Sequence, residues 1–401
     1  MEVRAGYSVT ERGMIPEDWA LKPISQVAPL QRGFDLPIRN IRLGRYPVIY
    51  SNGVENFNDT AMVKGPGVVT GRSGTLGKVH YVDGDYWPHN TSLWVTRFND
   101  NDPKFIYYLY ESLHFERFAS GSGVPTLNRN DAHSYLIAIP TNYGEQRAIA
   151  AALSDVDALL AALDRLIAKK RDLKEATTQQ LLTGQTRLPG FHGEWELKRL
   201  GELGWTYGGL TGKTKSDFGE GEGRYITFMS IMSSVVIHLE HFERVRVPPR
   251  ESQNRVMRGD LLFNGSSETP EEVGMCSLMM DAVQNLYLNS FCFGFRFHDG
   301  VEAHALFLAY YIRSNEGREL MKSLAQGSTR YNLSKAALLN ALIRVPRLPE
   351  QIVIAAVLSD MDTELATLEA RLYKTRALKL GMMQELLTGR TRLVPAGRAD
   401  A

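Results

Sequence analysis

The chain lacks several features that mark whole classes of protein. It has only two cysteines, Cys276 and Cys292, and no Cys-x-x-Cys pair. We therefore expect reduced thiols rather than a disulfide framework. No apolar run reaches the roughly 18 residues that a membrane helix needs, and residues 1–19 contain no apolar core typical of a signal peptide. These absences predict a cytoplasmic protein without a membrane span.

The chain also has little net charge. Its 46 basic and 45 acidic residues leave a formal charge of +1. Such a balance neither indicates nor excludes a nucleic-acid binder, because acidic residues elsewhere can offset a basic face. The length of 401 residues is enough for two or three domains. A hydrophobic content of 43% is ordinary for a globular protein.

The most informative feature that is present is a 44-residue segment that occurs twice, at 145–188 and 350–393. The copies align without a gap at an offset of 205 residues (350 minus 145), and 24 of the 44 positions are identical. In each copy, six apolar residues follow the spacing of a coiled-coil seam. The seam residues are Ile149, Leu153, Val156, Leu160, Leu163 and Ile167 in the first copy, and Ile354, Leu358, Met361, Leu365, Leu368 and Leu372 in the second.

Each copy is predicted to form one long helix that ends at a Thr-Gly pair, near 183 and 388. About 38 helical residues span roughly 57 Å. A helix of this length with one apolar stripe needs a partner, and its own repeat is the best candidate. Lys174 and Lys379 fall where the seam should continue, while a leucine precedes each of them, so we expect the seam to shift register there. The alternative is an amphipathic helix packed on a globular core.

The segments between the helices share little sequence that can be aligned. Both contain strand-like runs, glycine turns and a helical stretch, predicted at 104–119 and at 303–325. The predicted organisation is a first globular domain, a helix, a second globular domain, a second helix and a tail, with boundaries at 1–144, 145–188, 189–349, 350–393 and 394–401. A duplicated scaffold that carries two different domains suits a protein that reads two different features at a set separation.

No stretch forms a convincing catalytic or metal site. Gly71–Lys78 has five residues, rather than four, between its first glycine and the Gly-Lys pair, so it does not fit a P-loop. Residues 102–105 lack the second proline of an adenine-methyltransferase loop. The histidines at 238 and 241 lack the HExxH spacing. The glutamates within 268–272 favour a solvated acidic loop over a set of nuclease ligands.

Basic and amide side chains recur on loops of both globular segments, and these are the types that contact phosphates and base edges. Each one alone is most often an ordinary surface residue, and only their recurrence suggests DNA. The candidate DNA-binding residues are Arg72, Ser73, Thr75, Lys78 and Asn128 in the first segment, and Lys213, Lys215, Asn264, Ser266, Arg330, Tyr331 and Asn332 in the second. Five arginines also cluster within 244–258.

In its order of parts, the chain resembles a specificity subunit of a type I restriction-modification enzyme. A Trp-x-Leu-Lys opening precedes a variable segment, a Gly-Val-Pro-Thr-Leu-Asn loop at 123–128, and an Ile-Pro pair. Glu-Gln, Leu-Ser-Asp-x-Asp and a long helix ending in Leu-Leu-Thr-Gly then follow. The order occurs twice and covers nearly the whole chain. The second copy departs from it, because its loop at 327–334 reads GSTRYNLS and lacks Val-Pro.

The resemblance implies an α+β fold with two target-recognition domains, each similar to the DNA-reading domain of adenine methyltransferases. The two long helices would pair as an antiparallel coiled coil, with an internal pseudo-two-fold repeat and the domains at opposite ends. Each domain would read one half of a bipartite site in double-stranded DNA, and the coiled coil would set the spacer and dock the methyltransferase subunits.

The resemblance also implies that the chain has no active site of its own. Two methyltransferase subunits would supply S-adenosylmethionine, and restriction subunits would use ATP and Mg²⁺, in a system that defends against foreign DNA. Three alternatives stay open at this point: a type IIB specificity subunit, a self-contained DNA methyltransferase or nuclease, and a coiled-coil scaffold that binds only proteins. The sequence gives neither the recognised bases nor the spacer length.

Overall fold

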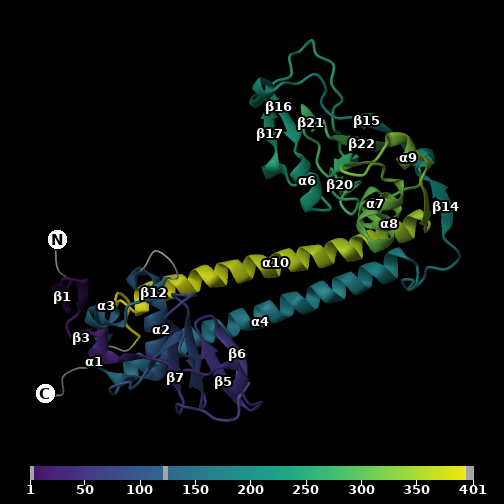
Figure 1. The fold of residues 1–401 in the computed structure, drawn as a ribbon. Coiled ribbons are helices and arrows are strands. Elements are labelled where there is room, and N and C mark those ends of the chain that lie inside the picture. Colours follow the sequence, from purple (N-terminus) through teal and green to yellow (C-terminus); the bar gives the residue numbers. More distant parts are fainter. Residues whose placement is uncertain (1–3, 121–124, 394–401) are drawn as a thin grey trace. The chain divides into compact units, whose positions relative to one another are not determined.

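The computed structural model describes residues 4–120 and 125–393. The chain divides into two compact units, Met1–Arg165 with Glu369–Ala401 (unit 1) and Leu166–Leu368 (unit 2). Each unit contains one globular domain and part of each long helix, α4 (Tyr143–Leu182) and α10 (Leu348–Leu386) (Figure 1). The predicted tail at 394–401 and residues 121–124 of the glycine loop lie outside the described residues.

The globular part of unit 1 is built on two small sheets. An antiparallel sheet has the strand order β4-β10-β7-β8, and a three-stranded sheet has the order β6-β5-β9 with β5 and β9 parallel. The pairs β1–β2, β3–β13 and β11–β12 complete the unit. Its strands are β1 (Tyr7–Thr10), β2 (Gly13–Pro16), β3 (Trp19–Pro23), β4 (Leu30–Arg32), β5 (Tyr46–Tyr50), β6 (Gly53–Asn58), β7 (Gly67–Gly71), β8 (Val79–Val82), β9 (Trp87–Pro88), β10 (Ser92–Val95), β11 (Ala119–Ser120), β12 (Thr126–Leu127) and β13 (Leu136–Pro140).

Short helices cover these sheets: α1 (Ile24–Val27), α2 (Pro103–Ser112) and α3 (Arg129–Ser134), with the 3-10 turns η1 (Ile38–Asn40) and η2 (Phe115–Phe118). The Asp102 side chain starts α2 by accepting a hydrogen bond from the Phe105 amide at 2.9 Å. The predicted helix at 104–119 ends early, because His114 adopts a left-handed conformation with φ of 52° and separates α2 from η2.

Unit 2 repeats this plan. Its antiparallel sheet has the order β15-β22-β18-β20, and its three-stranded sheet has the order β17-β16-β21 with β16 and β21 parallel. The pairs β14–β24 and β19–β23 complete it. The strands are β14 (Glu196–Arg199), β15 (Gly204–Gly208), β16 (Phe218–Ile226), β17 (Glu243–Val245), β18 (Leu261–Asn264), β19 (Ser266–Ser267), β20 (Cys276–Leu278), β21 (Leu286–Leu288), β22 (Cys292–Phe297), β23 (Tyr331–Asn332) and β24 (Leu342–Val345).

The helical segment predicted at 303–325 is two helices rather than one. The helices of unit 2 are α5 (Leu200–Leu203), α6 (Phe228–Ser233), α7 (Ala305–Arg313), α8 (Asn315–Leu324) and α9 (Lys335–Asn340), with the 3-10 turns η3 (Lys215–Asp217) and η4 (Leu239–His241). Ser314 separates α7 from α8 because its backbone is extended, with ψ of 166°. Its hydroxyl accepts a hydrogen bond from the Gly317 amide at 3.3 Å and so caps α8.

Backbone hydrogen bonds show that the internal repeat includes the globular parts. The Ile24 amide donates to the Tyr135 carbonyl at 3.0 Å, and at the equivalent place the Leu200 amide donates to the Ala341 carbonyl at 3.0 Å. A Cβ added to Gly33 would lie 2.1 Å from the His89 carbonyl oxygen, and one added to Gly209 would lie 2.0 Å from that of Asn289. The same close approach therefore requires glycine in both units.

The two long helices pair antiparallel within each unit. In unit 1, Asp157 of α4 bonds Lys379 of α10 at 2.9 Å, and further along α4 Asp164 bonds Arg376 at 3.3 Å. In unit 2, Lys170 lies 2.7 Å from Glu364. Residue numbers thus rise along one helix while they fall along the other. Within the described ranges, no helix is both long and apolar enough to cross a bilayer.

All twelve predicted seam residues are buried or half-buried. The first residues of each seam lie in a globular core rather than only against the partner helix. Ile149 and Leu153 share the core of unit 1 with Leu386, at the end of α10. Ile354 and Leu358 occupy the same place in unit 2. The helices therefore pair with each other and also pack on the globular domains.

The expected register shift of the seam is wrong. Leu173 and Leu378 are 49% and 57% exposed, whereas Lys174 and Lys379 turn inward. Polar partners make this possible. The Lys379 ammonium bonds the Asp157 carboxylate, which also accepts a hydrogen bond from the Tyr108 hydroxyl at 2.8 Å. Lys174 bonds Asp362 in the same way, and Asp362 accepts from Tyr310 at 2.7 Å.

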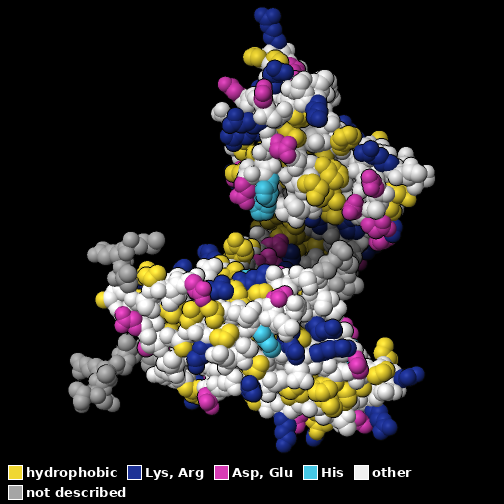
Figure 2. Space-filling model, turned by 60° about the vertical axis from the view of Figure 1, so that its left-hand side comes forward, with side chains coloured by type: hydrophobic (Ala, Val, Ile, Leu, Met, Phe, Trp, Pro, Cys, Tyr) yellow, Lys and Arg dark blue, Asp and Glu magenta, His cyan; other side chains and the backbone are white. Residues whose placement is uncertain are grey.

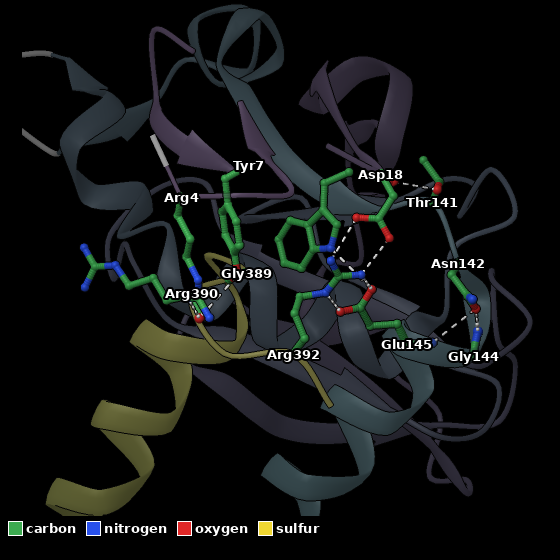
Figure 3. A network of polar contacts seen from close by, with 11 residues as sticks. Arg4, Tyr7, Asp18, Thr141, Asn142, Gly144, Glu145, Gly389, Arg390 and Arg392 are labelled. Atoms are coloured by element: carbon green, nitrogen blue, oxygen red, sulfur yellow. Dashed lines mark hydrogen bonds and ion pairs between the residues drawn. The ribbon is translucent and has the colours of Figure 1, made fainter. Parts of the chain in front are cut away.

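An arginine after each long helix ties the chain together. Arg392 donates to Asp18 and to Glu145, at the start of α4, with four bonds between 2.5 and 2.9 Å (Figure 3). The Tyr7 hydroxyl also donates to the Gly389 carbonyl at 2.8 Å. In unit 2, Arg187 donates two bonds of 2.6 Å to Glu350. The residue numbers of the two arginines differ by the repeat offset of 205, and so do those of the two glutamates. The ion pair therefore occurs at the same place in both copies of the repeat.

Candidate nucleic-acid interface

Three segments of unit 1 meet just after β7. The amides of Arg72 and Ser73 donate to the Thr91 carbonyl at 2.8 and 3.1 Å, and Ser73 pairs with Thr126. The Arg72 guanidinium donates to the Asn90 carbonyl at 3.3 Å. We call the set Arg72, Ser73, Asn90, Thr91 and Thr126 junction 1. It brings an arginine, three hydroxyls and an amide together at the edge of the sheet.

The equivalent place in unit 2 has the same backbone bonds. The Gly265 amide donates to the Phe291 carbonyl at 2.9 Å, and Ser266 pairs with Asn332. The Arg330 guanidinium donates to the Ser266 hydroxyl at 2.8 Å and lies 5.3 Å from the centre of the Phe291 ring. We call the set Gly265, Ser266, Phe291, Arg330 and Asn332 junction 2.

The backbone bonds make the two junctions comparable position by position. Leu127 donates its amide to the Arg72 carbonyl at 2.8 Å, as Leu333 donates to the Gly265 carbonyl at 3.0 Å. Position 72 therefore corresponds to position 265, which is a glycine. Each junction nevertheless contains a guanidinium, since Arg330 supplies it from another segment. Hydrogen bonds made by the main chain keep the frame while the side chains differ.

Two of the predicted site residues of unit 1 lie in junction 1, namely Arg72 and Ser73. Thr75 and Lys78 lie in the turn between β7 and β8, where Thr75 is half-buried and Lys78 is exposed. That turn leads into strand β8, whereas a P-loop leads into a helix, so the turn is not a P-loop. The Asn128 side chain caps α3 by accepting from the Asn130 amide at 3.0 Å. The side-chain oxygen of Asn128 is therefore already engaged in a hydrogen bond that stabilises the start of α3.

Ser266, Arg330 and Asn332 of the predicted set lie in junction 2, and Tyr331 pairs with Ser267 beside it. Asn264 is completely buried. Its amide donates to the Glu272 carbonyl at 3.0 Å and accepts from the Met275 amide at 2.6 Å. Both ends of this side chain therefore hold the loop that follows β19.

The two predicted lysines of the loop after β15 have different surroundings. The Lys213 side chain is only 6% exposed, and its ammonium bonds Glu251 at 2.6 Å and the Arg246 carbonyl at 2.7 Å. Lys215 is exposed and makes no ion pair with any described residue. Lys215 is therefore the better placed of the two to meet a phosphate.

The arginine cluster at 244–258 also contains one arginine in an ion pair and four that are exposed. Arg246 bonds Asp217 at 3.4 Å, while Arg244, Arg250, Arg255 and Arg258 are exposed and form no ion pair within the described ranges. Arg244 stands directly opposite Arg224 in the β16–β17 ladder. Like charges at such positions repel, and an anion between them would relieve the repulsion. Sequence analysis missed Arg224 because only strand pairing brings it to the cluster.

A second basic group that sequence analysis missed lies in the loop between β4 and β5. Arg39, Arg42 and Arg45 are exposed there at every third position. This spacing was visible in the sequence and could have marked the loop. Asp35, at the start of the loop, accepts a hydrogen bond from the Asn90 side chain of junction 1. The loop therefore begins beside Arg72.

His89 helps to hold the turn of junction 1. Its Nδ1 atom lies 3.0 Å from the Thr91 hydroxyl, and its ring lies 4.2 Å from the ring of Tyr50. Burial lowers the pKa of His89 below its ordinary value. The imidazole is therefore neutral at physiological pH, and one nitrogen can accept a hydrogen bond while the other donates.

A family model described as the type I restriction modification DNA specificity domain matches residues 16–170 and 192–375. These two matches cover most of the chain. This chain belongs to that family. Junction 1 falls within the first match and junction 2 within the second, so each copy of the DNA specificity domain contains one junction.

Two solved structures share the fold of this DNA specificity chain. The S subunit of a type I restriction-modification system from M. genitalium aligns with a TM-score of 0.63 and 17% identity, over 96% of this chain and 98% of its own. A structure described as "Structural basis underlying complex assembly and conformational transition of the type I R-M system" aligns with a TM-score of 0.54 and 17% identity, over 94% and 99%. These likenesses confirm two specificity domains and two long helices as the fold.

Proposed function

We propose that this chain is a non-catalytic specificity subunit, and that each globular domain reads one half of a bipartite DNA site. The paired helices would set the unread spacer and dock methyltransferase subunits. The observation that carries the proposal is the pair of junctions, in which one backbone frame presents different side chains. A frame used twice with different side chains suits two different half-sites.

The chemistry of the junctions supports base reading. Arg72 and Arg330 each place a guanidinium where three backbone segments converge, and a guanidinium can donate two hydrogen bonds to guanine O6 and N7. Asn90 and Asn332 add amides, which suit adenine. The exposed arginines of both units would bind phosphates, so affinity should fall as salt rises.

Catalysis would belong to partner subunits. Burial raises the pKa of the Cys276 and Cys292 thiols to about 12, so neither is a ready nucleophile. We expect methyltransferase subunits to supply S-adenosylmethionine and methylate adenine after flipping it from the duplex. Restriction subunits would use ATP and Mg²⁺.

The proposal is tested by producing the chain together with the methyltransferase subunit encoded beside it and mapping methylated adenines across the host genome. The expected result is a two-part motif with a fixed unread gap, absent when either subunit is omitted. Methylation or cleavage by the purified chain alone would instead indicate a self-contained enzyme. Assembly of the two subunits without any such motif would favour a protein scaffold.

A further inference from the structure

The loop between β4 and β5 of unit 1 exposes two large hydrophobic side chains. Leu43 is 97% exposed and Ile38 is 85% exposed, the two highest values among the large hydrophobic residues that the structure describes. Burying side chains this exposed would release free energy, so a partner that covered the loop would gain from contact with them. On the face seen in Figure 2, hydrophobic side chains lie among Lys and Arg at several places on the surface.

The loop holds Leu43 in place from both sides. The Arg42 amide donates to the Asn58 side chain at 2.9 Å, and Asn58 is only 2% exposed. On the other side, a Cβ added to Gly44 would lie 2.3 Å from the Asn58 carbonyl oxygen, so the loop rests directly on that backbone. Leu43 is therefore exposed because its anchored neighbours hold it outward.

Charges around the loop favour a nucleic acid over a protein. Arg39, Arg42 and Arg45 alternate with the exposed apolar residues, and Arg39 and Arg42 form no ion pair with any described residue. The acidic residue of the loop, Asp35, is already bound to Arg32 and Asn90. An apolar side chain between phosphate-binding cations is the pattern of proteins that open a base step.

The matching loop of unit 2 lacks such a pair of exposed hydrophobic residues. The equivalent loop, between β15 and β16, carries Lys213 and Lys215, and no large hydrophobic residue from 206 to 228 is exposed there. The difference cannot come from the frame, because Phe34 and Leu210 anchor the two loops with the same 2.8 Å backbone bond, to Pro88 and Leu288. Of these two equivalent loops, only that of the first domain therefore has an apolar tip.

We propose that Leu43 acts as a wedge that enters a base step of the first half-site, while Arg42 and Arg45 bind the flanking phosphates. This inference rests on the proposed function and adds a mode of reading to it. Opening a base step costs less at flexible pyrimidine–purine steps, so the wedge would select sequence through deformability as well as through direct contacts. The first half-site would then be distorted at that step.

The test uses the complex of this chain with its methyltransferase subunits and a duplex carrying the mapped site. 2-Aminopurine replaces one base at a time in each half-site, except at the methylated adenines, where flipping gives its own signal. The wild-type complex should increase fluorescence at one step of the first half-site only. Leu43→Ala should abolish that increase and weaken binding about tenfold. Leu43→Met should keep the fluorescence increase and the wild-type affinity.

Two matched variants complete the design. Leu239→Ala removes an exposed leucine of unit 2 and should change neither signal nor affinity. Arg42→Ala should lower the slope of log affinity against log salt by about 0.9, as expected for one lost phosphate contact. Because Leu43 touches almost nothing, Leu43→Ala should melt at the wild-type temperature.

Two results would overturn the wedge while leaving the proposed function intact: no fluorescence increase at any first-half-site step, or an increase that survives Leu43→Ala. Weaker assembly with the methyltransferase subunit at unchanged DNA affinity would identify the loop as a protein-docking surface and would also refute the wedge. A wild-type complex with no bipartite motif would reject both proposals.

Discussion

Unit 1 and unit 2 hold an arginine at the same place by different means. Arg72 follows β7 and bonds the Asn90 carbonyl, whereas Arg330 precedes β23 and bonds the Ser266 side chain. Two of the surrounding backbone bonds correspond: the Arg72 and Gly265 amides donate to Thr91 and Phe291, and the Leu127 and Leu333 amides donate to Arg72 and Gly265. The comparison teaches that the frame depends on main-chain groups, which every residue supplies, so the side chains at its edge were able to diverge.

The closing ion pairs differ in strength rather than in position. Arg392 binds both Asp18 and Glu145, and the Trp19 indole also donates to Glu145 at 3.3 Å. Arg187 binds one carboxylate, that of Glu350, and two backbone carbonyls, those of His192 and Gly193. The Trp195 indole nitrogen, equivalent to that of Trp19, is buried with no hydrogen-bond partner among the described residues. The arginine of unit 1 therefore joins two carboxylates, whereas the arginine of unit 2 joins one carboxylate and two carbonyls.

The largest expected effect comes from breaking that ion pair. Arg392→Ala leaves the Glu145 carboxylate, of which 2% is exposed, without its cation. Losing one partner of a buried pair costs about 3–5 kcal/mol. We expect the free energy of unfolding to fall by that amount in chemical denaturation, and by less for Arg187→Ala. An equal loss for both variants would show that the second carboxylate adds nothing.

The next effect concerns DNA recognition and separates the two junctions. Arg72→Ala should relax or abolish the first half-site, and Arg330→Ala the second, because each lost bidentate contact removes about 1–3 kcal/mol of discrimination. Methylation mapping of each variant measures this directly. Subunit assembly should be unchanged in both. An unaltered motif in either variant would remove that arginine from the proposed interface.

A smaller effect is expected from the inward lysines. Lys379 bonds two carboxylates, Glu111 and Asp157, and is 14% exposed, whereas Lys174 is 26% exposed. Lys379→Met should therefore destabilise the protein by about 1–2 kcal/mol and Lys174→Met by less. Denaturant titration of both variants, with Lys374→Met on the exposed face as control, checks the order. The reverse order would mean that burial of the lysine does not govern its contribution.

The smallest effect is a difference in pH sensitivity. Burial lowers the pKa of His80, His89 and His133 in unit 1 but only of His304 in unit 2, among the described histidines. A histidine whose folded pKa is lowered stabilises the fold while neutral. That contribution is present above the unfolded pKa of about 6.5 and is lost as the pH falls through it.

Unit 1 should therefore loosen more than unit 2 between about pH 7.5 and about pH 5.5. Hydrogen exchange of the full chain, corrected for the intrinsic rate at each pH, measures the two units separately. His133→Gln supplies a check, because the His133 ring accepts a hydrogen bond from the Leu30 amide at 2.9 Å. This variant should reduce the pH difference, and an unchanged difference would exclude His133 as a cause.

Sequence analysis recovered the parts of the structure that depend on local pattern. The duplicated heptads predicted both long helices, and the twelve apolar residues assigned to the seam are buried or half-buried, because a periodic apolar stripe determines which face is buried. It erred at Leu173 and Leu378, since the choice between a leucine and the next lysine depends on Asp157 and Asp362 across the helix pair. No local pattern contains that information.

Only some of the predicted DNA-binding residues lie in the junctions, for the same reason. Arg72, Ser73, Ser266, Arg330 and Asn332 lie in the junctions. Asn264 and Lys213 have residue types that suit DNA, but burial and internal partners engage them in the fold. Arg224 and Asn90 were missed because strand pairing and a turn bring them to the interface. Residue type predicts what a side chain can bind, while only its surroundings decide whether it is available.

The sequence by itself determined that this protein has two copies of one scaffold, because 24 identities in 44 positions are visible without any structure. Only the tertiary structure decided that the two domains between the helices are also copies of one frame. The physical reason is that backbone hydrogen bonds between segments far apart in the chain preserve a fold without preserving side chains. Side-chain identity is all that a sequence records.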